Sequence, residues 1–238
     1  MPRARDVTGK TASNKGTDHH QPTVAVFVVI FTVHEQGLKV LLIRRGGEPF
    51  KGWWAIPGGR LGTDETLDEA AARKLVEETG VRDVYLEQLY TFGDLDKTTP
   101  AGAVAIGYFA LVNYDSVSLP EREDWPTAWF SIDELPASPA GKLELAFNNK
   151  DVLDYALRRL RYKLEYTNVA YSLLPPYFTM SQLQTVYESI AGKKLDKRNF
   201  RKRVLAMGIV KPTEKTVLFG AHRPAKLYTF SSRQPQII

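Results

Sequence analysis

The chain has 238 residues, of which 43% are hydrophobic and 25% charged, a composition typical of a soluble globular protein with one or two domains. It contains no cysteine, which excludes disulfides, thiolate metal sites and a cysteine nucleophile and favours a reducing, cytoplasmic location. The longest apolar run, residues 24–33, is about half of the ~20 residues that a membrane-spanning helix needs, so we expect a buried strand there.

The formal net charge of +5 is distributed unevenly along the chain. Residues 1–150 contain 16 Lys and Arg but 21 Asp and Glu, whereas residues 151–238 contain 16 Lys and Arg and only 6 Asp and Glu. The first part therefore has a net charge of −5 and the second a net charge of +10. This asymmetry favours two domains with different partners and a polyanion as partner of the second, although a solvated basic face would give the same charge.

The first half of the chain predicts an α/β domain that follows a disordered tail. Residues 1–21 are polar and hold too few apolar side chains to order themselves. A capping box, in which Thr66 and Glu69 bond reciprocally, predicts a helix over 67–79. The element order predicts a mixed sheet packed against helices, within a domain of residues 22–148. Runs of β-branched and aromatic residues predict its strands, at 23–33, 38–44, 84–92, 104–112 and 128–130.

The second half predicts a helical linker followed by a small α+β domain. Residues 149–166 place apolar side chains at helical spacing and form the predicted linker helix. Two short helices and a hairpin follow a Pro-Pro break, which describes a winged helix-turn-helix domain over residues 167–238. The predicted helices cover 180–191 and 197–207, and the predicted hairpin strands cover 209–211 and 226–230 around a loop at 212–225.

A spaced set of glycine, arginine, acidic and apolar residues lies within 23 residues, before and along the first predicted helix. These residues match eight of the nine defining positions of the Nudix signature, so residues 22–148 resemble a Nudix domain. The resemblance implies an α/β/α sandwich with a mixed sheet. Independently of it, carboxylates three or four residues apart share one helix face and suit Mg²⁺, which in turn binds a diphosphate. The matching residues are Gly59, Glu65, Arg73, Leu75, Glu77, Glu78, Gly80 and Val81.

Lys74 departs from the Nudix signature, which has a glutamate at this position. Lys74 lies three residues before Glu77 and four before Glu78, so its ammonium shares their helix face and can pair with either carboxylate. The charge of this cluster falls from −3 to −1. We therefore expect this signature segment, the Nudix box, to be degenerate and without catalytic residues. It would bind Mg²⁺ weakly if at all, through Glu77 and Glu78. The other interpretation is that Lys74 is a tolerated change in a working hydrolase.

Arginines and aromatic residues near the glycine loop are the predicted ligand-binding groups. Arginine matches phosphate geometry and an aromatic ring can stack on adenine, although we expect one of Trp53 and Trp54 to fill the core. Residues 89–94 are similar to the segment that follows the box in ADP-ribose-binding Nudix proteins, which implies an ADP-ribose-like ligand. The predicted ligand-binding residues are Arg44, Arg45, Trp54, Gly59, Arg60, Glu77 and Glu78, with Phe50 as a further candidate.

The second predicted helix of the C-terminal domain is strongly basic, since seven of the eleven residues at 193–203 are Lys or Arg. At 100° per residue, Phe200 and Val204 form its buried stripe, and Arg198 and Lys202 point away from it. We expect this helix to enter the DNA major groove, with phosphate contacts from its surroundings. A solvated face of a protein-interaction domain is the other interpretation. The predicted DNA-binding residues are Thr179, Ser181, Lys193, Lys194, Lys197, Arg198, Asn199, Arg201, Lys202, Lys211, His222 and Arg223.

Residues 22–230 combine the altered box with the basic segment Leu-Asp-Lys-Arg-Asn-Phe-Arg at 195–201, and together they resemble the Nudix-related transcriptional regulators (NrtR). The resemblance implies repression of NAD-biosynthesis or salvage genes in the bacterial cytoplasm, by a homodimer that binds a palindromic operator. It also implies ADP-ribose as the effector and no required cofactor. The alternative is an active Nudix ADP-ribose pyrophosphohydrolase with an accessory nucleic-acid-binding domain.

Overall fold

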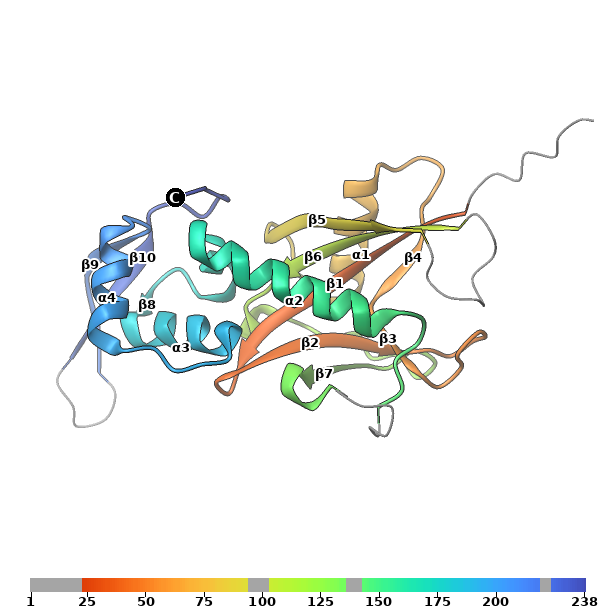
Figure 1. Cartoon of the computed structure of the whole chain (residues 1–238), viewed down its shortest axis with the longest axis horizontal. Coiled ribbons are helices and arrows are strands. Elements are labelled where there is room, and N and C mark those ends of the chain that lie inside the picture. The colour runs from red at the N-terminus through yellow and green to blue at the C-terminus, as the bar shows by residue number, and fades with distance from the viewer. Residues whose placement is uncertain (1–22, 94–102, 136–142, 219–223) are drawn as a thin grey trace, which may run out of the picture.

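The structure is a computed structural model that describes residues 23–93, 103–135, 143–218 and 224–238 (Figure 1). The predicted tail at 1–21 lies outside these ranges, as do His222 and Arg223. In the described part of the chain, no helix is long and apolar enough to cross a membrane.

A seven-stranded mixed sheet forms the centre of the N-terminal half. Its main path runs β3-β2-β1-β6-β5, with β4 paired to β1 and β7 paired to β2. β1 and β6 are parallel in register from Val24–Val104 to Phe31–Leu111, and the other pairs are antiparallel. The strands are β1 (Val24–His34), β2 (Gly37–Arg44), β3 (Trp54–Ala55), β4 (Gly58–Arg60), β5 (Tyr85–Phe92), β6 (Val104–Leu111) and β7 (Thr127–Ser131).

Helices α1 (Leu67–Thr79) and α2 (Asn149–Tyr166) cover opposite faces of this sheet (Figure 1). Successive residues of a strand point to opposite faces, and β1 shows this directly. Val28 packs in the cluster that contains α1, whereas its neighbour Val29 packs in the cluster that contains α2. The predicted α/β/α sandwich is therefore confirmed, and the capping box at Thr66 that predicted α1 is present.

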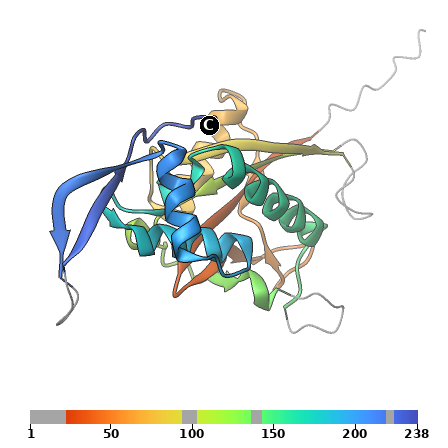
Figure 2. The same cartoon turned by 60° about the vertical axis from the view of Figure 1, so that its left-hand side comes forward.

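The C-terminal half is a winged helix-turn-helix, as predicted. Its three-stranded sheet has the order β8-β10-β9, with α3 and α4 packed beside it. Figure 2 shows the β9–β10 hairpin, in blue, projecting from the body of the molecule. The elements are α3 (Met180–Ala191), α4 (Lys197–Ala206), β8 (Phe178–Thr179), β9 (Val210–Val217) and β10 (Ala225–Phe230).

The hairpin strands are longer than predicted, because the predicted loop at 212–225 contains most of β9. Pro212 indicated a loop, yet it pairs with Tyr228 in the ladder. β9 lies at the edge of its sheet, where a proline without an N–H costs no hydrogen bond. The sequence analysis also missed the short strands β3, β4 and β8. Within the described residues, the 3₁₀ helices are Tyr114–Ser116, Ile132–Glu134 and Val169–Leu173.

The two halves share one apolar core. Phe109 of the large sheet, Leu160 of α2 and Leu183 of α3 are fully buried members of the same cluster. Polar contacts join the halves as well, since Ser189 Oγ donates to the Gln36 carbonyl at 2.9 Å. The helix predicted at 149–166 is confirmed, and its apolar face packs in the core that both halves share. The predicted domain boundaries on either side of it stay predictions.

Candidate functional site

A cavity of about 490 Å³ opens beside β1 and β4, at the beginning of α2. Its walls are mainly apolar, and Gly58 and Gly59 form part of them. Gly58 has no room for a side chain, since a Cβ would lie 2.7 Å from that of Phe27. Other wall residues are Phe27, Ile43, Arg45, Pro49, Ile56, Arg60, Ala105, Trp125, Phe147 and Asn149.

Arg45 is the charged group that the fold holds most firmly in this wall. Its Nε donates to the Pro49 carbonyl at 2.8 Å. Its guanidinium lies 4.9 Å from the ring centre of Phe147 and 5.8 Å from that of Trp125. Burial lowers the pKa of Arg45 from its usual value, yet a guanidinium stays charged in proteins. Aromatic walls beside a held guanidinium can bind a flat base together with a phosphate.

Of the seven predicted ligand-binding residues, Arg45, Gly59 and Arg60 line the cavity. Trp54 is not a wall residue, since its ring packs edge-on against Phe130 at 4.7 Å, and its role in ligand binding stays a prediction. Arg44 does not line the cavity, and its exposed side chain donates to the Gly52 carbonyl at 3.0 Å, so its role in ligand binding stays a prediction as well. Glu77 and Glu78 are not wall residues either, because α1 carries them beyond the glycine loop.

Trp125 and Phe147 are the wall residues that the sequence analysis missed. Trp125 lies between two predicted strands and Phe147 lies before the predicted helix at 149–166, in irregular segments where no periodic pattern marks a residue as a neighbour of the glycine loop. Only the tertiary fold brings them beside Arg45. Phe50 is near the cavity but packs against Phe147 at 4.9 Å between ring centres, so it supports the wall.

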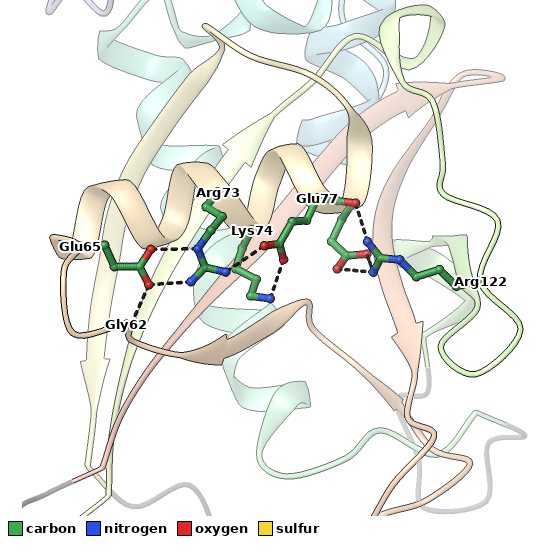
Figure 3. A network of polar contacts seen from close by, with 7 residues as sticks. Gly62, Glu65, Arg73, Lys74, Glu77 and Arg122 are labelled. Carbon is green, nitrogen blue, oxygen red and sulfur yellow. Dashed lines mark hydrogen bonds and ion pairs between the residues drawn. The ribbon is translucent and has the colours of Figure 1, made fainter.

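Three carboxylates of the box are already bonded to cations (Figure 3). Arg73 donates to both oxygens of Glu65, at 2.6 and 2.9 Å, and to Glu77 at 2.9 Å. The hydrogen bond from Arg73 is the main reason that the pKa of Glu65 falls to about 2. Lys74 Nζ lies 2.6 Å from Glu77 Oε2. Burial raises the pKa of Glu77, but the hydrogen bonds from Lys74 and Arg73 outweigh it and lower that pKa.

Glu78, the third carboxylate, pairs with a residue that the sequence analysis missed. Arg122 Nη1 lies 3.0 Å from Glu78 Oε1 and 3.2 Å from Oε2, and Nη2 donates to the Glu77 carbonyl at 2.9 Å. Glu78 is only 4% exposed, whereas the Arg122 side chain is 37% exposed, so the carboxylate is buried but its partner still meets water. Sequence spacing could not show the contact, because Arg122 is 44 residues from Glu78.

This arrangement does not fit Mg²⁺, which requires several free oxygen ligands at near-ideal octahedral geometry. Glu65, Glu77 and Glu78 each accept from a guanidinium or ammonium. In the part of the chain that the structure describes, no group of three His, Asp or Glu side chains is arranged to hold a metal ion. Lys74 also lies close to the glycine loop, since a Cβ on Gly59 would lie 2.9 Å from Lys74 Cε.

The exposed face of α4 is the second candidate site. Phe200 and Val204 are buried, with Phe200 packed edge-on against Tyr187 at 5.2 Å, so the opposite face is turned to solvent. Arg201 donates to the Tyr228 hydroxyl at 2.8 Å, which connects α4 to the hairpin. Lys194 pairs with Glu188 at 3.0 Å. The predicted residues with exposed side chains are Ser181, Lys193, Lys194, Lys197, Arg198, Asn199, Arg201, Lys202 and Lys211.

Thr179 is buried at the start of α3, and its predicted phosphate contact stays a prediction. Its side chain is 6% exposed and accepts from the backbone of Gln182 as the N-cap of α3. Ser181, two residues further, is exposed and lines a cleft of about 220 Å³ together with Thr179, Lys197 and Arg201. The start of α3 therefore contributes to a positively charged cleft.

Family comparisons match both halves of the chain. The model of the NUDIX domain matches residues 21–154, and the model of the NrtR DNA-binding winged helix domain matches residues 170–230. The chain is 37% identical to the ADPR responsive transcriptional repressor NtrR of Acinetobacter baylyi, over 92% of this chain and 86% of that protein. The chain belongs to the NrtR family. This confirms the resemblance that the altered box and the basic segment indicated.

Solved structures of the NrtR family agree with this fold. The chain matches Shewanella oneidensis NrtR complexed with a 27mer DNA, with a TM-score of 0.76 and 33% identity over 87% of this chain and 93% of that one. It also matches the NUDIX domain of the same protein complexed with ADP ribose, with a TM-score of 0.51 and 32% identity over 59% of this chain and 89% of that one.

Proposed function

We propose that this protein is a transcriptional repressor of NAD-biosynthesis or salvage genes. It binds DNA through α4 and senses ADP-ribose-like nucleotides through the Nudix domain. The exposed face of α4 carries the proposal: Arg198, Arg201 and Lys202 are exposed on a helix held by buried Phe200 and Val204. Such a face supplies the donors that base edges and phosphates require. The Shewanella relative has been solved with a 27mer DNA, which supports DNA binding by this chain.

The cavity supports an ADP-ribose-like effector. Its volume of about 490 Å³ is within the range of small-molecule sites, roughly 300–1,000 Å³. Trp125 and Phe147 offer aromatic surface to a base, and Arg45 and Arg60 offer charge to a diphosphate. The NUDIX domain of the Shewanella relative has been solved with ADP ribose.

The box supports a regulator without significant hydrolase activity, in which no cofactor is required. Lys74 and Arg122 pair with the carboxylates that would otherwise hold a divalent cation. The second candidate function, an ADP-ribose pyrophosphohydrolase with an accessory nucleic-acid-binding domain, is favoured by one observation, the match to the NUDIX domain. The same carboxylates separate the two functions, because a hydrolase needs them free.

Helix α2 provides a physical connection between the two sites. Asn149, its first residue, lines the cavity and accepts from the Ile56 backbone N–H at 2.7 Å. Near its other end, Arg161 donates to the Ile190 carbonyl of α3 at 2.9 Å. A ligand that prefers one position of α2 would thereby shift the recognition helices, since a ligand moves an equilibrium by its differential affinity. On a palindromic operator, a homodimer in the bacterial cytoplasm would lose half-site register.

Selection of bound DNA from a random pool tests the proposed function. We expect the full chain to enrich one palindromic sequence, as a symmetric dimer requires. Affinity for that sequence is expected to fall roughly 10³-fold between 50 and 200 mM salt if six or more phosphates are contacted. A pool without any enriched sequence after repeated selection would contradict the assignment.

A further inference from the structure

The positive charge of Arg122 lies beside Glu78 and the C-terminal end of α1. Arg122 comes from the segment at 117–126, between a 3₁₀ helix and β7, and reaches the last turn of α1. That turn has no basic residue of its own, although the C-terminal end of a helix favours a cation. The Arg122 guanidinium bonds both Glu78 oxygens and the Glu77 carbonyl, so it satisfies a buried carboxylate and the helix end together.

The segment that carries Arg122 is fixed independently of this ion pair. The Arg44 backbone N–H donates to the Pro126 carbonyl at 2.8 Å. A Cβ on Gly46 would lie 2.5 Å from the Asp124 carbonyl oxygen, so the two segments touch closely. The fold therefore holds the backbone that carries Arg122 near Glu78, so the contact requires ordering of the side chain alone.

We propose that Arg122 is a built-in counter-cation that occupies Glu78 in place of a divalent metal ion. Lys74 does the same for Glu77, so the box contains two separate blocks to metal binding, one from α1 and one from a distant segment. Lys74 is recognisable from the sequence, because it replaces the glutamate of the Nudix signature. The contact between Arg122 and Glu78 is seen only in the three-dimensional structure. The inference rests on the proposed regulatory function of this domain, but metal binding can be measured without DNA, ADP-ribose or turnover.

If so, restoring the signature glutamate at position 74 is not sufficient to restore divalent-metal binding. In K74E the helix regains a third carboxylate, yet Arg122 still occupies Glu78. Only K74E/R122Q frees Glu78 as well, and ligand charge and number set the affinity of a divalent cation for such a site. A matched control is K74E/R82Q, because Arg82 is an exposed arginine three residues after α1 and its loss changes the net charge equally.

Mn²⁺ binding to the folded full-length proteins, measured from the free Mn²⁺ signal in electron paramagnetic resonance, tests the proposal. We expect K74E/R122Q to bind Mn²⁺ at least about tenfold more tightly than K74E, and K74E/R82Q to stay within about twofold of K74E. Equal affinities of K74E and K74E/R122Q would overturn the proposal. So would wild-type affinity equal to that of K74E/R122Q.

Removal of Arg122 leaves Glu78 buried without its partner, which can unfold the domain. A second measurement, thermal denaturation of K74E/R122Q with and without Mn²⁺, covers this case. We expect Mn²⁺ to raise its melting temperature, because the ion replaces the missing charge. The melting temperature of E78Q/R122Q, which lacks the charge pair, is expected not to respond. The absence of a response in K74E/R122Q would count against Arg122 as a substitute for the metal.

Discussion

Replacement of Arg198 and Lys202 by alanine is expected to weaken binding of the selected operator at least about 100-fold. Both side chains are exposed on the face of α4 opposite Phe200 and Val204, and neither forms an ion pair within the described residues. Each specific base contact contributes ~1–3 kcal/mol, and a phosphate contact adds to the binding free energy. The fold-losses in affinity from the two substitutions therefore multiply. In a dimer, each half-site loses the same contacts.

Fluorescence anisotropy with the selected DNA measures this effect. The control is the double variant of Lys51 and Arg82, two exposed residues of the Nudix half, which removes the same charge. It is expected to bind the operator within a few-fold of wild type, because long-range charge is screened beyond about 10 Å at 0.1 M salt. ADP-ribose binding of both variants should be unchanged. Equal operator affinity of the two variants would refute α4 as the recognition helix.

Turnover of ADP-ribose with Mg²⁺ is expected to be at least about a thousandfold below the ~10 s⁻¹ typical of enzymes. The physical reason is that a metal ion would have to displace Lys74 from Glu77 and Arg122 from Glu78. Glu78 is buried while Arg122 is 37% exposed, so displacing the guanidinium from this carboxylate costs free energy that the metal ion must first offset. The metal-generated hydroxide of a hydrolase would therefore rarely form.

Release of AMP, followed by chromatography, measures this turnover. An active Nudix ADP-ribose pyrophosphatase in the same buffer serves as the positive control, and EDTA as the negative one. A rate above ~1 s⁻¹ for the purified chain would show that Lys74 is tolerated in a working hydrolase.

The elements with strong local signals were predictable from the sequence. Thr66 and Thr179 open α1 and α3 with capping boxes that the structure contains, and the apolar period predicted α2 to its bounds. The spacing of Lys74 to Glu77 on one helix face also predicted their pairing. Capping hydrogen bonds and helical periodicity depend on residues that are close together in the sequence. They can therefore be predicted without knowledge of the tertiary fold.

Features that depend on distant residues were not predictable in this way. Arg122 and Trp125 reach the box and the cavity only through the path of the chain between β6 and β7. Trp54 was predicted to bind the ligand, and the sequence did not show that its ring, on β3 paired with β2, packs against Phe130. Pro212 was placed in a loop because an edge position cannot be recognised without the order of the strands.

The effect of ADP-ribose on operator affinity tests the central claim most directly, namely that a cavity in the Nudix domain controls a DNA-binding surface through α2. We expect saturating ADP-ribose to change the dissociation constant of the full chain for its selected operator by at least about fivefold, the lower end of ordinary coupling between sites. Arg45→Ala should bind the operator like wild type and lose this response, because Arg45 lines the cavity. An operator affinity that stays constant while calorimetry shows the cavity saturated with ADP-ribose would contradict the account.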